Sequence, residues 1–198
     1  ANAKNTPILI VNLTKAMSDE TVAMLKRHVD AGGVLVGDLG LDYRDANSAE
    51  TRPGRLLSLF GVKSVGKPAE EKKTIQFSGS IPGYGPLDLK TERCTVDKSV
   101  KLTDGTALGE IDGIPIAIYR KSGKGLALLL NFNMSHALDQ ASSKQAKVTA
   151  EADFILQLMR LAKVSPQIQP RKGLPWNTVR LFRHGDGLIV GLHGSKVD

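Results

Sequence analysis

The sequence predicts an α/β domain with a mainly parallel central sheet flanked by helices, followed by a short C-terminal β hairpin. Three observations support this prediction. Residues 8–39 contain an apolar run, an amphipathic helix and a second apolar run, which is the order of a βαβ unit. Residues 144–163 place apolar side chains three and four positions apart, as a helix packed on a sheet requires. Segments 178–183 and 188–193 flank a Gly-Asp-Gly turn that is typical of a hairpin.

Length and composition indicate one folded domain with a small appendage. The chain has 198 residues, of which 41% are hydrophobic and 24% are charged, and this balance is typical of a globular protein with a core. We therefore expect a domain over residues 1–165 and a linker with the hairpin over 166–198.

Cys94 is the single cysteine, which excludes an internal disulfide and a multi-thiolate zinc site. It does not indicate in which cellular compartment the protein works. Ala1 stands where an initiator Met is expected, so we expect a chain that is processed or excised from a longer one.

The formal net charge of +7 raises the question of nucleic acid or membrane binding. The basic residues are dispersed, and aromatic residues make up only 5% of the chain, which leaves few rings to stack on bases. No apolar run approaches the roughly 18 residues of a membrane-spanning helix, and the N-terminus lacks a signal-peptide pattern. We therefore expect neither nucleic acid nor membrane as a partner, and an acidic surface elsewhere in a longer parent protein to balance the charge.

The N-terminal elements follow from strand and helix signals. Residues 8–13 form a continuous apolar run, typical of a strand buried on both faces. Ser18 can cap a helix whose first turn holds two acidic residues, and Gly32-Gly33 ends that helix. Residues 34–39 then form the second strand, parallel to the first.

The middle of the chain alternates turn signals with short apolar runs. A polar loop over 40–55 leads to a short helix over 53–60. Short strands are expected around 74–77, 95–100 and 114–119, with a loop over 80–86. Residues 114–120 and 126–132 form an antiparallel hairpin, and its second strand is apolar enough to lie inside the sheet.

Candidate site residues lie at the carboxyl end of the predicted strand 34–39. Open α/β sheets bind their ligands at this edge. Asp38 lies at the end of the strand, Asp42 and Arg44 lie in the loop that follows it, and His136 follows strand 126–132 closely enough to approach the same edge. These four residues are the candidate ligand-binding set, and a carbohydrate is the candidate ligand. Solvated salt bridges are the competing interpretation.

Catalytic and metal chemistry have weaker support from the residues. An acyl-transfer nucleophile at the strand end would be Cys or Ser, whereas Asp38 stands there. Arg44 and Arg52 interleave with the acidic side chains and favour ionised carboxylates, which argues against a general acid with a raised pKa. The four histidines are far apart, and no P-loop, GxGxxG, HExxH or CxxC motif occurs. We assign no catalytic residue, no metal ligand and no cofactor.

Four stretches of sequence support a family resemblance. They are Met-Ser-Asp-Glu-Thr at 17–21, Leu-Lys-Arg-His-Val-Asp-Ala-Gly-Gly-Val-Leu-Val at 25–36, Arg-Pro-Gly-Arg-Leu-Leu-Ser-Leu-Phe-Gly-Val at 52–62, and Gly-Lys-Gly with Leu-Asn-Phe within 123–132. Together they resemble the trimerisation domain of the glycoside hydrolase family that contains bacterial β-galactosidases, a relative of class I glutamine amidotransferases. The resemblance covers residues 7–165, and 176–193 resemble the start of the small β domain that follows in such enzymes.

The resemblance implies a fold and a function. The fold would be a flavodoxin-like or class I amidotransferase-like three-layer sandwich. In amidotransferases the strand that corresponds to 34–39 delivers a cysteine nucleophile, but Asp38 stands near that place, and Asn133-Met134-Ser135 replaces the expected His-x-Glu. In the hydrolases this domain lies outside the catalytic barrel and supports subunit contacts.

We therefore expect this chain to be non-catalytic by itself, as an accessory or oligomerisation domain of a larger carbohydrate-active protein. Its partners would be copies of itself or other domains of the parent. The alternative is a hydrolase or a small-ligand-binding domain that uses the polar edge with Asp38, Asp42, Arg44 and His136.

Overall fold

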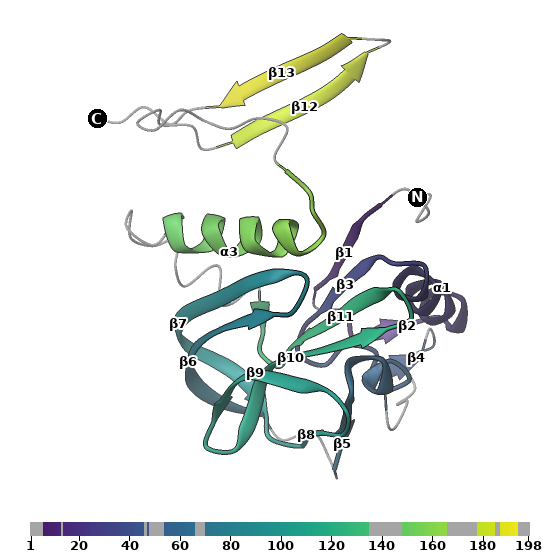
Figure 1. Ribbon diagram of the computed structural model, residues 1–198, viewed down its shortest axis with the longest axis vertical. Helices are drawn as coiled ribbons and strands as arrows, with labels where there is room; N and C mark the ends of the chain where they lie inside the picture. Colours follow the sequence, from purple (N-terminus) through teal and green to yellow (C-terminus); the bar gives the residue numbers. More distant parts are fainter. Residues whose placement is uncertain are drawn as a thin grey trace. The chain divides into compact units, whose positions relative to one another are not determined.

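The computed structural model describes residues 6–12, 14–45, 47, 54–65, 70–134, 148–165, 178–184 and 187–193. Residue contacts divide the chain into two units, Ala1–Ser165 and Pro166–Asp198. The strands of the first unit are β1 (Ile8–Val11), β2 (Ala16–Met17), β3 (Val34–Gly37), β4 (Arg44–Asp45), β5 (Val62–Ser64), β6 (Glu70–Ile81), β7 (Gly85–Asp97), β8 (Val100–Leu102), β9 (Thr106–Ile111), β10 (Ile114–Ser122) and β11 (Gly125–Leu130) (Figure 1). Its helical elements are α1 (Asp19–Asp30), the short 3-10 helix η2 (Leu57–Phe60) and α3 (Val148–Leu161).

A mixed five-stranded sheet forms the centre of the first unit, in the order β1-β3-β11-β10-β9. β3 pairs in parallel with β1 on one side and with β11 on the other, where Val34 lies opposite both Ile8 and Leu126. β11 pairs with β10, and β10 with β9, in antiparallel fashion. The parallel β1–α1–β3 unit and the β10–β11 hairpin are therefore as predicted. Every residue of β11 is buried, which suits a strand covered on both faces.

Helix α1 begins and ends where the sequence indicates. The Ser18 hydroxyl accepts a hydrogen bond from the backbone N–H of Thr21 at 3.1 Å, which confirms the predicted N-cap. Val22, Leu25 and Val29 form the buried face of the helix. The helix ends just before Gly32, whose φ of +110° is a conformation that favours glycine.

The sheet separates two hydrophobic cores. On one face, α1 and η2 cover Leu35 of β3 and Leu129 of β11. On the other face, the β6–β7 hairpin and α3 cover the sheet, and the ring of Phe154 meets Phe77 edge-on with 6.3 Å between centroids. Figure 1 shows this hairpin and α3 beside the sheet, opposite α1.

The predicted fold class, a flavodoxin-like or class I amidotransferase-like sandwich with a mainly parallel sheet, is wrong. The described chain is mostly β, and its central sheet is mixed. The physical reason lies in residues 70–81, where buried Ile75, Phe77 and Ile81 alternate with exposed polar side chains at the period of a strand. A long β hairpin therefore covers the face where a parallel fold would place a crossover helix. The loop predicted over 80–86 is a tight turn between two paired strands.

The second unit consists, in its described residues, of one hairpin. β12 (Thr178–His184) pairs in antiparallel register with β13 (Gly187–His193), with Val179 opposite Leu192. This is the hairpin that the sequence predicts. Among the described residues of the whole chain, no helix combines the length and the apolar character needed to cross a membrane.

Candidate functional site

The carboxyl edge of the parallel strands holds a polar residue after each strand. Asn12 follows β1, Asp38 follows β3 and Asn131 follows β11, and parallel strands end at one edge of a sheet. Asp38 and Asn131 are each only 1% exposed. The edge predicted to bind a ligand is therefore built around buried polar groups, which must find hydrogen-bond partners within the fold.

Asn131 joins three strands at this edge. Its side-chain oxygen accepts a hydrogen bond from the backbone N–H of Asp97 at 3.3 Å. Its side-chain nitrogen donates to the carbonyl oxygens of Asp97 and Pro115, both at 2.9 Å. These bonds link the end of β11 to the end of β7 and the start of β10, so one carboxamide satisfies three backbone groups in the interior.

The Asp97 carboxylate continues this network. Its Oδ2 accepts a hydrogen bond from the Tyr43 hydroxyl at 2.7 Å, and its Oδ1 accepts one from the Ser99 N–H at 2.8 Å. Asp97 is fully buried. Burial, and then the neighbouring Asp97 carboxylate, raise the pKa of Tyr43 because both disfavour the phenolate. Tyr43 is therefore a hydrogen-bond donor at neutral pH.

Because the pKa of Tyr43 is raised in the folded chain, the free energy of unfolding decreases as the pH rises through the alkaline range. Below a pH of about 10 the phenol is protonated in folded and unfolded chains; above it the unfolded chain ionises first, so stability falls. We expect Tyr43→Phe to cost about 1 kcal/mol at pH 7 through the lost hydrogen bond. The difference between the two proteins should shrink as the pH rises from about 10 to 11, in urea unfolding curves. Tyr119→Phe serves as the control, and a difference that stays constant with pH would contradict this account.

A second network lies around Asp42 in the loop after β3. Asp42 is fully buried and has a φ of +59°. The Nε of Arg55 donates to its two oxygens at 3.1 and 3.3 Å, and Nη2 of Arg55 bonds to Asp42 as well. The same guanidinium pairs with Asp19 and donates to the Met17 carbonyl at 2.8 Å. The Asp42 hydrogen bond is the main reason that the pKa of Arg55 is raised.

The predicted site residues thus have different surroundings. Asp38 and Asp42 are both buried, and the Asp38 carboxylate accepts a hydrogen bond from the backbone N–H of Met134 at 3.4 Å. Arg44 is exposed in β4, where its backbone N–H bonds to the Lys15 carbonyl at 2.8 Å. His136 lies outside the described residues. Ligand binding by this set stays a prediction.

Sequence reasoning did not single out the residues that hold this edge together, which are Tyr43, Arg55, Asp97 and Asn131. Asn131 had a usable signal, because it is the polar residue directly after an apolar strand, as Asp38 is. Arg55, which bonds to Asp42, and Asp97, which bonds to Asn131, come from other segments of the chain. No local pattern in the sequence marks these two contacts.

Two further chemistries have little support among the described residues. Cys94 is buried, and this burial raises the pKa of its thiol, which disfavours the thiolate that a nucleophile needs. Within the described part of the chain, His, Cys, Asp and Glu side chains form no group of three or more that could hold a metal ion.

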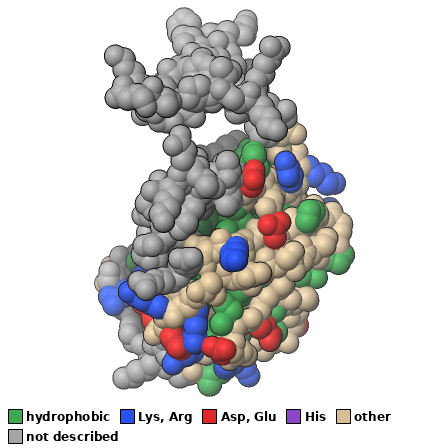
Figure 2. Space-filling model, turned by 90° about the vertical axis from the view of Figure 1, so that its left-hand side faces the viewer, with side chains coloured by type: hydrophobic (Ala, Val, Ile, Leu, Met, Phe, Trp, Pro, Cys, Tyr) green, Lys and Arg blue, Asp and Glu red, His purple; other side chains and the backbone are tan. Residues whose placement is uncertain are grey.

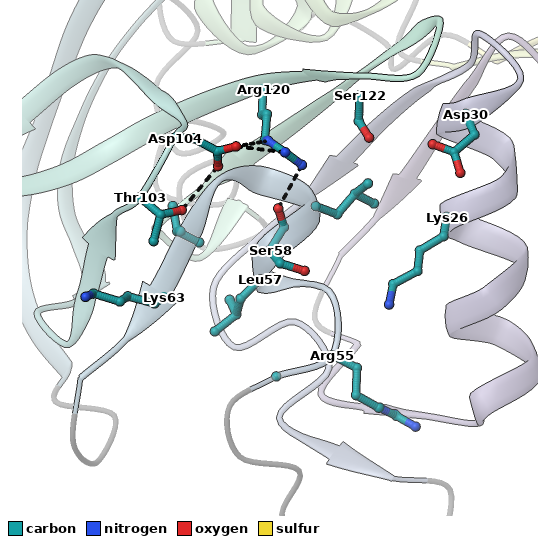
Figure 3. Close-up of a pocket in the computed structure, with 13 residues that line it drawn as sticks. Lys26, Asp30, Arg55, Leu57, Ser58, Lys63, Thr103, Asp104, Arg120 and Ser122 are labelled. Atoms are coloured by element: carbon teal, nitrogen blue, oxygen red, sulfur yellow. Dashed lines mark hydrogen bonds and ion pairs between the residues drawn. The ribbon is translucent and has the colours of Figure 1, made fainter.

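An open groove of about 800 Å³ lies on the α1 side of the first unit. Its basic side chains are Lys26 of α1, Arg55, Lys63 of β5 and Arg120 of β10. Figure 3 shows Arg120 paired with Asp104, which it contacts at 2.7 Å, and donating to the Ser58 carbonyl at 3.1 Å. Lys26 extends from α1 toward the segment with Leu57 (Figure 3).

Solved structures with a similar fold include β-galactosidases. The chain aligns with a beta-galactosidase from Rahnella sp. R3 at 18% identity and a TM-score of 0.64, over 95% of this chain and 27% of that one. It aligns with a catalytic mutant of a GH42 beta-galactosidase from G. stearothermophilus at 18% identity and 0.62, over 94% and 26%. A beta-galactosidase from Bacillus circulans sp. alkalophilus aligns at 17% and 0.58, over 90% and 26%.

These similarities concern the fold. The chain spans about a quarter of the length of the β-galactosidases that it matches. No family model matches the chain. No curated protein matches it in sequence. The chain therefore has the fold of a segment of these glycoside hydrolases.

Proposed function

We propose that this chain is a non-catalytic accessory domain that supports the assembly of a larger carbohydrate-active protein. The fold similarity to one quarter of several β-galactosidases supports the carbohydrate link. The observation that most favours a non-catalytic role is that Asp38, Asp42 and Asp97 are buried and bonded to the chain itself. Their oxygens hold loops and strand ends in place.

Glycoside hydrolysis needs a different arrangement of carboxyl groups. Two of them must flank a space that admits the sugar, and one must stay protonated near neutral pH. The oxygens of Asp42 accept hydrogen bonds from the Arg55 guanidinium, and Asp97 accepts bonds from Tyr43 and Ser99. A sugar could reach these oxygens only by displacing their present donors.

The assembly role can be tested by the mass of the chain in solution. Size-exclusion chromatography with light scattering, over roughly 1 to 100 µM protein, should give a mass that rises with concentration above 21.2 kDa. Mass action gives this rise where the dissociation constant lies within the range, and a tighter oligomer gives a constant multiple of the monomer mass. A constant mass of 21.2 kDa over the whole range would contradict self-association.

The enzymatic alternative can be tested with chromogenic galactosides. We expect no turnover by the isolated chain. Turnover that disappears in Asp38→Asn, while Asp88→Asn keeps it, would overturn the proposal and identify the polar edge as a catalytic site. Asp88 is a suitable control because its carboxylate is exposed on β7, away from this edge.

A further inference from the structure

We propose that the groove on the α1 side binds an acidic peptide segment of a partner protein. The groove has a volume of about 800 Å³ and is open. An open groove suits an extended segment better than a small molecule, whose binding sites bury most of its surface. Four basic side chains line it and only two acidic ones, Asp30 and Asp104. The groove shares Arg55 with the network at the carboxyl edge, but the inference does not depend on self-association.

The four cations come from separate parts of the chain. Lys26 lies on α1, Arg55 precedes η2, Lys63 lies on β5 and Arg120 lies on β10. By contrast, basic and acidic side chains are interspersed on the described part of the face in Figure 2. The groove therefore has more basic than acidic side chains in its lining, and they lie along its length rather than at one point.

Two of these cations are available to a partner. Arg120 pairs with Asp104, and Arg55 pairs with Asp42 and Asp19. Within the described part of the chain, neither Lys26 nor Lys63 forms a salt bridge. A lysine ammonium is a compact charge on a flexible stem, so the two amines can adjust to carboxylates that lie along a peptide.

The rest of the lining favours a peptide over a sugar. Leu57, Leu59 and Val62 also line the groove but are buried in the core, so they offer a partner little apolar surface. The described lining residues include no aromatic side chain that could stack on a sugar ring. Hydroxyl groups of Ser58, Thr103 and Ser122 can exchange hydrogen bonds with a peptide backbone. The net charge of +7 also favours an acidic partner over a basic one.

The test uses the full chain and a fluorescein-labelled peptide of about eight residues, glutamates with two leucines. Anisotropy at about 50 mM salt should give a dissociation constant near 0.1 mM, and salt of about 0.3 M should weaken binding at least threefold. Lys26→Glu and Lys63→Glu should each weaken binding about fivefold. Lys72→Glu makes the same charge change at an exposed position of β6 and should alter the dissociation constant less than about twofold. Circular dichroism confirms folding, and Lys26→Ala and Lys63→Ala replace any variant that unfolds.

Four outcomes would overturn this proposal. The first is that the peptide does not bind, and the second is that a matching lysine peptide binds equally well. The third is that Lys72→Glu weakens binding as much as the groove variants do. The fourth is that polygalacturonate binds and the peptide does not. The last would assign the groove to an anionic polysaccharide. None of these outcomes changes the mass that light scattering measures. The peptide-binding proposal can therefore be wrong while the assembly proposal stands, and the reverse.

Discussion

Replacing Asn131 by leucine should destabilise the first unit by about 3–5 kcal/mol. Leucine has a similar volume but no polar atoms, so the N–H and carbonyl of Asp97 and the carbonyl of Pro115 lose their partner. Each buried backbone group left without a partner costs about 1–3 kcal/mol, and part of this cost is recovered by small rearrangements. The site is closed to solvent, since Asn131 is 1% exposed.

Urea unfolding followed by circular dichroism measures this loss. Gln76→Ala is the matched control, because it removes a carboxamide from the exposed face of β6 and should change stability by less than about 0.5 kcal/mol. Asn131→Asp should recover little, because a carboxylate can accept but cannot donate to the two carbonyls. A loss below about 1 kcal/mol in Asn131→Leu would show that this carboxamide does not join the three strands.

Replacing Asp42 by asparagine should cost about 2–4 kcal/mol. Asparagine tolerates the φ of +59° almost as well as aspartate, so the change tests the charge and leaves the backbone unstrained. Arg55 would keep Asp19 and the Met17 carbonyl but lose its one fully buried anionic partner. The Arg55 side chain is 22% exposed, which places the expected cost below that of a fully buried pair.

A double-mutant cycle isolates this pair. Asp42→Asn, Arg55→Met and the double variant should give a coupling energy of about 1–3 kcal/mol. Asp88→Asn is the control for the loss of a carboxylate on the surface, and it should change stability by less than about 0.5 kcal/mol. Additive effects of the two changes would mean that the pair does not tie the loop after β3 to the segment before η2.

Local signals predicted the elements whose partners are near in sequence. The Ser18 cap, the β1–α1–β3 unit and the β10–β11 hairpin depend on neighbouring residues and are present. The predicted helix over 144–163 corresponds to α3 at Val148–Leu161 within the described residues. Residues 53–60 were predicted to be a short helix, and 57–60 form a 3-10 helix that ends at Gly61.

The error in fold class arose where the pairing is less obvious. Residues 74–81 alternate strictly between polar and apolar side chains, but the Gly and Pro residues that follow suggested a loop. Gly85 and Pro86 instead begin β7, opposite Ile81 and Ser80. The short strand predicted at 74–77 is part of β6. The one predicted at 95–100 instead covers the end of β7, a turn and the first residue of β8, and β6 pairs with β7 over eleven positions.

The sequence predicts the edge of the sheet where the candidate site lies, but only some of the residues that form it. Strand ends predicted the carboxyl edge and its residues Asp38 and Asp42. Whether a polar residue there is open to a ligand depends on what covers it. The segments with Arg55 and Asp97 approach from elsewhere in the chain, and composition and spacing do not encode that approach.

The parallel pairing of β3 with β11 has a consequence for how the chain reaches its native state. Val34 and Leu126 are neighbours in the sheet, although the β6–β7 hairpin and β8–β10 lie between them in sequence. Closing so long a loop is entropically costly, while hairpins between adjacent segments form quickly. β6–β7 and β10–β11 should therefore be early structures, and the docking of β11 onto β3 the slow step that sets the folding rate.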